Sequence, residues 1–508
     1  MLQAIRTLAL ASALLWSGAS ASAPADGDWV TSMGDLAATR YSPLDDIDRS
    51  NVGRLRTLYS VVLGGAVEGG GNVRGALPYN LLVRDGYLYA VDGWGAVNKL
   101  DLRNKGKPVW RADAGQRNLD TWLQAHKGLA LHEGYVISGG ADGALLWIDD
   151  ATGMLVRTVS AGDPLDGYSL SAPPLVVGGK VLVAGSGPDR GGPLQFDAFD
   201  AASGEHLWRA DLGDARGLRG SVLQAASYDA SSGTLYWGVA MPTGPLPDEE
   251  RDIWFGNGVV ALDVADGTVK WQHRYEEGTS GATNEAGPYH VVGAEGGGPL
   301  LGHFDNEGRY RVFNAGDGAE AVVAPLFAEG AEGNCANVRA AAAFNSALSL
   351  RTGLVYGANA GGCLQGHLPI KTPSRGDWLG AYYRDADNAL GILTAADAAT
   401  GEVRAQHVFD FPLHAGATAT AGGLVFVTTA EGTLHALDDE SLEPLWSNHF
   451  GSLSSAPPLV FSVDGRQFVA VVVGGNALAG EISYRPPELG MSEGLMVLVV
   501  LGIPEAAP

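Results

Sequence analysis

Short runs of alternating or wholly apolar residues, each ended by a turn rich in Asp and Gly, occur along almost the whole chain. Examples are LLVRDGYLYAVDG (81–93), PLVVGGKVLVAG (174–185), SYDASSGTLYWGVA (227–240) and FSVDGRQFVAVVVGG (461–475). A period of two residues, interrupted by turn residues, is typical of short antiparallel strands. The pattern therefore predicts an all-β protein built from hairpins.

One hairpin pattern recurs: an apolar residue, one intervening residue, Asp, two further residues, a Thr/Ser-Gly-like turn and then often Trp. The Asp side chain is suited to accept from backbone N–H groups in the turn, and Gly tolerates positive φ. The next strand then places its Trp against a neighbouring unit. The pattern is seen at 97–110, 145–158, 196–208, 259–271, more weakly at 310–323, and at 393–405 and 434–446.

Each repeat unit holds about four short strands, at a spacing of roughly 40–60 residues, which fits the blades of a β-propeller. We expect an eight-bladed propeller of four-stranded blades forming one domain over residues 24–508, with the C-terminal strands pairing with the N-terminal segment in the last blade. The interval 323–393 is expected to hold a blade and an insertion. A seven-bladed ring and two stacked β domains are the alternatives.

The first 23 residues predict export. Arg6 precedes an apolar stretch at residues 7–16, and the small-residue sites Ala19-Ser20-Ala21 and Ala21-Ser22-Ala23 follow. This order is that of a secretory signal peptide, and the apolar stretch is too short to span a membrane. The later apolar run GLMVLVVLGIP (494–504) is expected to be one buried strand. We therefore expect a soluble periplasmic protein.

Charge and cysteine content narrow the function classes. The chain of 508 residues has a formal net charge of −24, which disfavours nucleic-acid binding and suits a basic protein partner or simple solubility. It has two cysteines, Cys335 and Cys363, and in an oxidising compartment an even count favours a structural disulfide between them. The sequence contains no Cys-x-x-Cys-His motif, so no c-type haem attachment is expected.

The repeats, together with DWVTSMGDLAATRYSPLDDIDRSNVGRL (28–55) and TAGGLVFVTTAEGTLHALD (420–438), resemble the quinoprotein alcohol dehydrogenases. That family implies an eight-bladed periplasmic propeller. It also implies pyrroloquinoline quinone (PQQ) with a calcium or lanthanide ion, and oxidation of an alcohol by hydride transfer to PQQ. The electrons would pass to a separate soluble cytochrome c. The small-molecule alcohol would bind in the central funnel, and the family also has a cysteine pair at the place of Cys335 and Cys363.

Aligning the strands assigns family positions to particular residues. Asp189 stands where the family has a glutamate ion ligand, and Ser186 matches a serine near the cofactor. Lys127 matches an arginine that contacts the quinone. Trp122 lies where the family stacks two cysteines on the cofactor, and His414 replaces a tryptophan. Four of these residues also have a structural interpretation: Asp189 in a turn beside Arg190, Trp122 in packing, Lys127 in a solvated loop and His414 at the funnel wall.

Other family positions are changed. Met241 replaces an asparagine ion ligand, Ala282 replaces the catalytic aspartate, Leu223 replaces a tryptophan below the cofactor and Asn306 replaces a cation. A thioether is a poor ligand for a hard ion. Glu285 is the remaining candidate for the catalytic base. The alternative function is therefore an inactive or repurposed propeller without PQQ or metal, which binds a small molecule or a protein partner.

Overall fold

A computed structural model describes residues 27–65, 81–92, 95–113, 128–140, 142–166, 168–170, 172–185, 193–213, 218–220, 222, 224–240, 255–275, 289–293, 298–305, 308–326, 346–361, 365–367, 382–384, 390–413, 415–452, 454, 456–474 and 495–505. Within these ranges the helices are three-residue 3-10 turns: η1 (Val52–Arg54), η2 (Leu102–Asn104) and η3 (Pro164–Asp166). No described helix has the length or the apolarity that crossing a bilayer requires.

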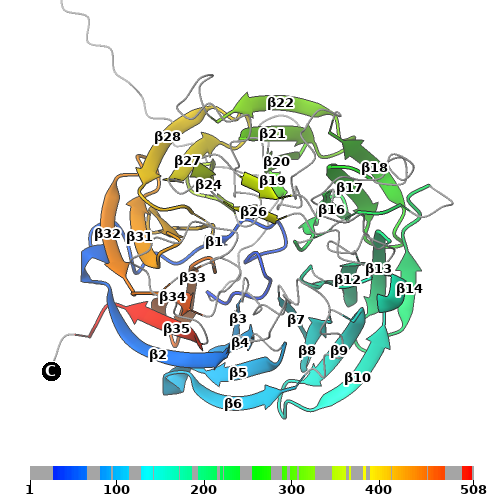
Figure 1. The fold of residues 1–508 in the computed structure, drawn as a ribbon, viewed down its shortest axis with the longest axis horizontal. Helices are drawn as coiled ribbons and strands as arrows, with labels where there is room; N and C mark the ends of the chain where they lie inside the picture. The colour runs from blue at the N-terminus through cyan, green and yellow to red at the C-terminus, as the bar shows by residue number, and fades with distance from the viewer. Residues whose placement is uncertain are drawn as a thin grey trace, which may run out of the picture.

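The described strands form eight sheets of four or five strands, arranged as a closed ring (Figure 1). Blade 1 holds β3 (Leu82–Arg84), β4 (Tyr87–Val91), β5 (Val97–Asp101) and β6 (Lys107–Ala112). Blade 2 holds β7 (Leu129–His132), β8 (Tyr135–Gly139), β9 (Ala144–Asp149) and β10 (Leu155–Ser160). Blade 3 holds β11 (Leu175–Val177), β12 (Lys180–Gly185), β13 (Gln195–Asp200) and β14 (His206–Arg209). Blade 4 holds β15 (Ser227–Asp229), β16 (Thr234–Val239), β17 (Gly258–Asp263) and β18 (Val269–Arg274).

The second half of the chain continues the same order and then closes the ring. Blade 5 holds β19 (His290–Val292), β20 (Leu300–Phe304), β21 (Arg309–Asn314) and β22 (Glu320–Pro325). Blade 6 holds β23 (Ala347–Leu348), β24 (Leu354–Gly361), β27 (Leu390–Asp397) and β28 (Val403–Phe409), with the inserted pair β25 (Gln365–His367) and β26 (Tyr382–Arg384). Blade 7 holds β1 (Tyr41–Ser42), β29 (Ala417–Thr420), β30 (Leu424–Thr428), β31 (Thr433–Asp438) and β32 (Pro444–His449). Blade 8 holds β33 (Leu459–Val463), β34 (Arg466–Gly474), β35 (Leu495–Gly502) and β2 (Arg56–Gly65).

The expected eight-bladed architecture is therefore confirmed, and the eighth blade closes as predicted. N-terminal β2 pairs antiparallel with C-terminal β35, from Arg56 opposite Gly502 to Gly65 opposite Leu495. The apolar run near the C-terminus is β35, as expected for a strand. Between residues 323 and 393 lie the predicted blade strands and the β25–β26 insertion. Cys335 and Cys363 lie outside the described residues, so their pairing stays a prediction.

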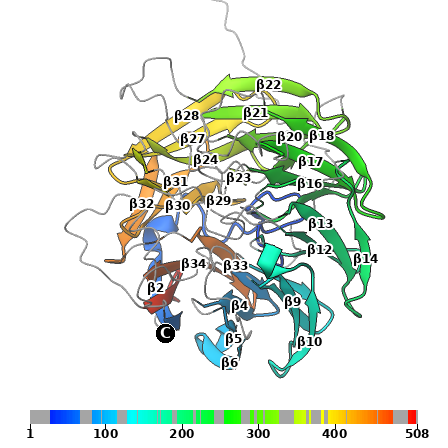
Figure 2. The ribbon, with the colours of Figure 1, turned by 45° about the vertical axis from the view of Figure 1, so that its right-hand side comes forward.

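Antiparallel strand order gives the ring two different faces. The turns between the first and second strands of a blade lie on one side, together with the turns between the third and fourth strands. We call this side the turn face. The turns between the second and third strands and the connections from one blade to the next lie on the opposite side, which we call the connection face. Figure 2 shows the ring obliquely, with outer strands such as β6, β10, β14 and β18 forming the rim.

The repeat predicted from the sequence is a joint between neighbouring blades at the turn face. The indole Nε1 of Trp110 donates to the carbonyl oxygen of Asp150 at 2.8 Å, Trp208 donates to Val264 at 3.3 Å, and Trp271 donates to Ala315 at 3.0 Å. Each acceptor is the residue that follows the repeat Asp or Asn in the next blade. We call each such contact a docking joint. The predicted packing of Trp on a neighbouring unit is thus confirmed for these three residues.

Glycine in the turn is required by the docked ring. Gly267 has φ of +77°, and a Cβ there would lie 2.5 Å from the ring of Trp208. The repeat Asp closes the same turns as predicted: the Oδ1 atom of Asp200 accepts from the backbone N–H of Ser203 at 2.7 Å. Positive φ and ring contact together exclude other residues at Gly267.

Docking joints between three further pairs of blades use donors at other positions or reach a neighbouring carbonyl. Between blades 2 and 3, the indole Nε1 of Trp147 donates to the carbonyl of Ala201 at 2.8 Å, and Arg157 Nη1 donates to that of Ala202 at 2.8 Å. Between blades 5 and 6 the hydroxyl of Tyr310 donates to Ala398 at 3.0 Å, and between blades 6 and 7 that of Tyr356 donates to Asp439 at 2.6 Å. The repeat turn of one blade is therefore an acceptor for an indole, a guanidinium or a phenol from the preceding blade.

A second link between blades runs through the middle of the ring. Residues 27–42, which we call the strap, cross the ring in Figure 1 and bond to the innermost strands. Trp29 exchanges two 2.8 Å backbone bonds with Val83 of blade 1. Strap carbonyls accept from four further innermost strands and from blade 8; the donors are Tyr228, Val291, Leu348, Ala419 and Ser462. Within the part of the chain that the structure describes, the strap thus bonds directly to six of the eight blades.

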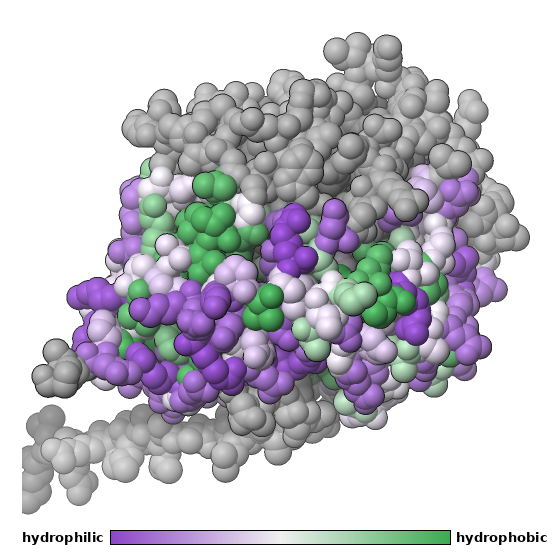
Figure 3. Space-filling view, turned by 90° about the horizontal axis from the view of Figure 1, so that it is seen from below, coloured by the Kyte–Doolittle hydropathy of each residue, from purple (hydrophilic) through white to green (hydrophobic). Residues whose placement is uncertain are grey.

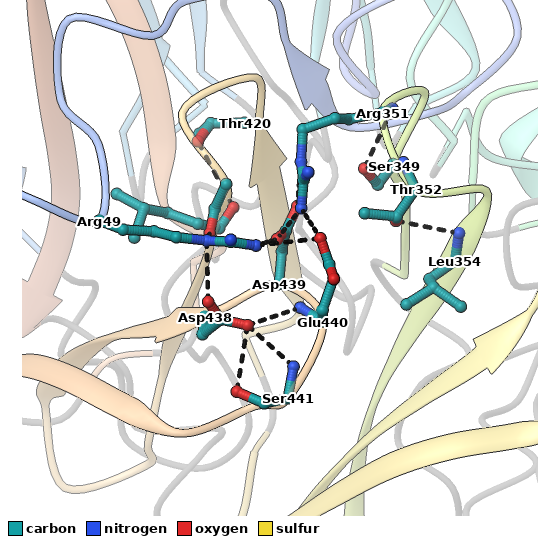
Figure 4. Close-up of polar contacts among 12 residues, drawn as sticks. Arg49, Ser349, Arg351, Thr352, Leu354, Thr420, Asp438, Asp439, Glu440 and Ser441 are labelled. Carbon is teal, nitrogen blue, oxygen red and sulfur yellow. Dashed lines mark hydrogen bonds and ion pairs between the residues drawn. The ribbon is translucent and has the colours of Figure 1, made fainter. Parts of the chain in front are cut away.

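After the strap, the chain crosses the turn face below blade 7 and is fixed there by an ion cluster (Figure 4). The carboxylate of Asp439 is fully buried and lies 2.6 Å from Arg49 Nη2 and 2.5 Å from Arg351 Nη2. Arg351 also pairs with Glu440 at 2.7 Å, and Arg49 Nε lies 2.8 Å from Asp438. Arg49 belongs to the N-terminal segment, Arg351 to blade 6 and the acids to blade 7. The cluster therefore fastens the N-terminal segment where it leaves the strap for β2.

Candidate functional site

The candidate site residues predicted from the sequence all lie outside the described residues. They are Trp122, Lys127, Ser186, Asp189, Glu285 and His414, and the same holds for Met241, Ala282, Leu223 and Asn306. Their roles therefore stay predictions.

The described strands that flank these candidates show at which face of the ring the candidate segments start and end. Trp122 and Lys127 fall between β6 and β7, Glu285 between β18 and β19, and His414 between β28 and β29, all of which are blade-to-blade connections. Ser186 and Asp189 fall between β12 and β13, the second and third strands of blade 3. By strand order, every one of these segments starts and ends at the connection face. The topology thus brings the flanking strand ends to one side of the ring.

Buried carboxylates are found at this face, and most are neutralised by cations of their own blade. Asp92 lies 2.7 Å from Arg111 Nη2 in blade 1, and Asp197 lies 2.8 Å from Arg209 Nε in blade 3. In blade 5 the carboxylate of Asp305 lies 2.7 Å from Arg311 Nε. Buried charges are commonly paired in this way because desolvation is costly. These acids therefore act first as structural partners of the arginines.

Blade 7 differs, because its connection-face acid is bonded to a hydroxyl. Glu431 is 8% exposed, and its Oε1 accepts from Thr429 Oγ1 at 2.8 Å. The same hydroxyl lies 3.3 Å from Nε2 of His435, whose pKa burial lowers to about 4, helped by nearby His407. His435 is therefore neutral near pH 7. Among the described residues no group of three His, Cys, Asp or Glu side chains is placed to hold a metal ion.

The strap contributes buried polar groups beneath this face. Arg40 is 1% exposed and donates to the carbonyls of Ser32, Ala417 and Pro458 and to the hydroxyl of Thr418, at 3.0–3.2 Å. Its guanidinium carbon lies 5.2 Å from the centroid of the Trp29 ring. Burial lowers the pKa of Arg40 to about 9. A guanidinium held by neutral acceptors thus lies buried between the strap and the innermost strands of blades 7 and 8.

Asp35 and His290 are two further buried titratable groups of the strap region. Asp35 accepts from the backbone N–H of Thr39 at 3.0 Å and from its hydroxyl, and burial raises its pKa to about 6 in spite of these bonds. His290 contacts the carbonyl of Ala38 through Nδ1 at 2.7 Å and Ser346 Oγ through Nε2 at 2.6 Å. A carbonyl only accepts, so Nδ1 carries the proton and Nε2 accepts from Ser346. Burial lowers the pKa of His290 to about 4.

The sequence patterns did not reveal the strap groups. Arg40 and Asp35 lie in the opening segment quoted for the family resemblance, yet nothing in their spacing indicates burial. The one usable signal was the presence of Arg and Asp in a segment without strand periodicity.

Comparison with known proteins adds family and fold. The family model described as "Glucose/ethanol/alcohol dehydrogenase, beta-propeller domain" matches residues 29–276. A second model, described as "Outer membrane protein assembly factor BamB", matches residues 389–481. The first match covers the strap and blades 1 to 4, and the second covers blade 7 with parts of its two neighbours.

Two curated relatives are similar along most of the chain. Quinoprotein alcohol dehydrogenase PedH of Pseudomonas putida is 26% identical, over 90% of this chain and 88% of its own length. The 1-butanol dehydrogenase (cytochrome c) of Thauera butanivorans is also 26% identical, over 90% of this chain and 76% of its own length. Among solved structures, a europium-containing methanol dehydrogenase superposes with a TM-score of 0.75 at 22% identity, over 94% of this chain and 98% of that one.

Proposed function

Because the chain belongs to the quinoprotein alcohol dehydrogenases as a divergent member, we propose that it binds PQQ at the connection face and oxidises an alcohol by hydride transfer to it. The observation that carries the proposal is the similarity to such a dehydrogenase over 90% of the chain, in a ring whose candidate segments all begin and end at one face. PQQ, when bound, supplies a quinone that accepts a hydride.

The proposal gives each candidate a role according to its chemistry. Lys127 and Ser186 supply hydrogen-bond donors to the oxygens of the cofactor, and Trp122 supplies an indole face for stacking. His414 lies at the funnel wall against the cofactor. Glu285 takes the proton of the alcohol, since a carboxylate can act as a general base. Asp189 is the candidate ligand for calcium or a lanthanide.

The donor set fits the quinone better than it fits the ion. Asp189 offers hard oxygen ligands, but Met241 offers a thioether where the family has an amide oxygen. The described carboxylates Asp92, Asp197 and Asp305 are each paired with an arginine. We therefore assign no step of the reaction to a metal ion.

Export and electron transfer belong to the same proposal. Residues 1–23 act as a signal peptide, residues 24–508 form the mature single-domain periplasmic propeller, and a soluble cytochrome c accepts the electrons. The support is the order of residues in the leader, the net charge of −24, which suits a basic partner, and a relative whose name includes cytochrome c as acceptor.

Reconstitution tests the proposal. Purified protein is incubated with PQQ, with and without calcium or a lanthanide, and reduction of a dye is followed with a panel of primary alcohols. We expect bound quinone absorbance, a rise in Tm and alcohol-dependent reduction. Absence of both quinone binding and a Tm shift under all metal conditions would contradict it.

A second function is favoured by four changed positions: Met241, Ala282, Leu223 and Asn306. Their joint replacement removes an ion ligand, a base, a stacking ring and a cation of the family pattern. In this alternative the ring binds a small molecule or a protein partner without catalysis. Tight PQQ binding with turnover would exclude it.

A further inference from the structure

Two buried tyrosines meet where the chain passes from blade 4 to blade 5. Tyr275 directly follows β18 and Tyr289 directly precedes β19, and they are 7% and 1% exposed. Their hydroxyl oxygens are 2.5 Å apart, and the Tyr289 hydroxyl lies 3.3 Å from the carbonyl of Gly258. A carbonyl only accepts, so Tyr289 donates to Gly258 and Tyr275 donates to Tyr289. The two hydroxyls thus form a directed chain that ends on blade 4.

Blade 5 fixes the orientation of both rings. The ring of Tyr289 stacks on that of His303, with centroids 4.2 Å apart and planes inclined by 12°. The guanidinium carbon of Arg311 lies 4.2 Å from the centroid of the Tyr275 ring, and Arg311 is itself bonded to Asp305 and Glu320. Phe313 lies nearly parallel to Tyr275, inclined by 10° with centroids 6.2 Å apart. Neither phenol can turn away without losing a ring contact.

The contact between the two hydroxyls joins the two ends of the connection from blade 4 to blade 5. Residues 276–288 lie between the tyrosines, and each end of this connection is also bonded to a blade. The backbone N–H of Tyr275 donates to the carbonyl of Asn257 at 2.9 Å, and His290, next to Tyr289, is held by Ala38 and Ser346. A hydrogen bond between hydroxyls at the two ends limits how far these two ends can separate.

We propose that Tyr275 and Tyr289 are positioning residues, which we call the tyrosine clasp, and that their hydroxyl contact fixes the base of the connection from blade 4 to blade 5. This inference rests on the proposed function, in which that connection presents Glu285 to the alcohol. The clasp touches neither alcohol nor cofactor in this role. It acts by holding the two ends of the segment that carries the base.

The test removes one oxygen atom at a time from the full-length protein. Tyr275→Phe, Tyr289→Phe and the double variant keep the ring contacts and lose the hydroxyl contact. The matched control is Tyr236→Phe, whose buried hydroxyl donates to the carbonyl of Ala315 at 3.1 Å, an acceptor also used by Trp271. The first readout is native-state cleavage by a glutamate-specific protease, with the cuts after Glu276, Glu277 and Glu285 identified by mass spectrometry.

We expect each clasp variant to be cut in this segment about 5- to 10-fold faster than the wild type, the opening expected from loss of one buried hydrogen bond. The double variant should match Tyr289→Phe, because that substitution alone already removes the contact between the hydroxyls as well as the bond to the carbonyl of Gly258. Tyr236→Phe should behave as the wild type. Equal cleavage of clasp variants and wild type, or equal acceleration in Tyr236→Phe, would overturn the proposal.

The second readout uses the PQQ-loaded protein. Misplacing a base lowers kcat by about tenfold while KM for the alcohol changes little, because binding groups are untouched. Faster cleavage with unchanged kcat would overturn the positioning role. If neither wild type nor variants bind PQQ, the proposed function fails and the role of Glu285 with it, while the cleavage rates still decide whether the clasp holds the connection.

Discussion

Each docking joint ties one blade to the next, whereas the strap crosses the inside of the ring and bonds to six blades among the described residues. The joints consist of one side chain, one carbonyl and a turn whose usual residue is glycine, and they accept Trp208, Arg157 or Tyr310 as donor. The strap uses backbone bonds and buried polar groups such as Arg40, which has four bonded neighbours. Local joints therefore tolerate substitution, and the strap should not.

The largest effect is expected when Arg40 is replaced. Arg40→Ala leaves a cavity beside Trp29 and removes a donor from the carbonyls of Ser32 and Ala417, and we expect it to lower the free energy of unfolding by about 3–5 kcal/mol. Urea unfolding followed by Trp fluorescence measures the loss. Arg54→Ala, an exposed arginine of the same N-terminal segment, is the control and should change stability by less than about 0.5 kcal/mol. Similar losses of stability in both variants would contradict the expected difference between a buried arginine of the strap and an exposed arginine.

The next effect compares two donors at equivalent joints. Trp208 is 8% exposed and covers Gly267, so Trp208→Ala should cost about 3 kcal/mol. Arg157 fills the corresponding place between blades 2 and 3 but is more exposed, so Arg157→Ala should cost about 1 kcal/mol. The shift of the urea midpoint at constant slope measures both. A loss at Arg157 equal to that at Trp208 would show that the joint, rather than burial of the ring, sets the energy.

The outer strands of the ring also carry apolar side chains that are exposed to solvent. Figure 3 views the ring from the side of β2, β6 and β10 and shows apolar side chains interrupting a mainly polar surface. Val109 of β6 and Leu155 and Val156 of β10 are 45–50% exposed, and neighbouring Met154 is 65% exposed. Apolar residues on an outer strand are thus left in solvent, whereas Trp110 of the same β6 finds a partner in the next blade.

Protonation of two buried groups in the strap region, Asp35 and His290, affects stability in opposite directions. The pKa of Asp35 is about 6 in the folded chain and 3.8 ordinarily, so its contribution is fully present below about pH 4 and is lost as the pH rises through 6. The pKa of His290 is about 4 against 6.5, so its contribution is present above about pH 6.5 and is lost as the pH falls towards 4. Between pH 4 and 6 the two slopes oppose each other.

Single variants should therefore reveal the pH dependence that each of the two groups contributes to the free energy of unfolding. From pH 4 to 6, the free energy of unfolding of Asp35→Asn should rise by about 2 kcal/mol more than that of the wild type, and that of His290→Gln should fall by about as much relative to it. Denaturant titrations at several pH values measure these differences. Parallel pH profiles for all three proteins would contradict the assignment of either group.

The same contrast explains how much could be predicted from the sequence. The Asp-turn-Trp pattern repeats, so its local chemistry predicted the hairpins, the joints at Trp110, Trp208 and Trp271 and, with the spacing, the eight blades. The strap repeats nowhere, and Arg40 meets Ala417 and Pro458, which are almost 380 and 420 residues away in sequence. No periodicity encodes such contacts. For the candidate site, strand order predicts the shared face, while the roles of Lys127 or Asp189 depend on loop conformations that strand patterns do not determine.

The smallest effect is expected at the joint between blades 5 and 6, where the donor is the phenol of Tyr310. The hydroxyl of Tyr310 is fully buried and donates to the carbonyl of Ala398 at 3.0 Å, and burial raises its pKa far above the ordinary value. Tyr310→Phe keeps the ring between blades 5 and 6 and loses only this bond, so we expect a loss of about 1 kcal/mol. The matched variant Tyr236→Phe leaves Ala315 still bonded to Trp271 and should lose less. If Tyr310→Phe costs as much as Trp208→Ala, the hydrogen bond and not the burial of the ring dominates the stability of the joint, as buried hydrogen bonds do in the strap.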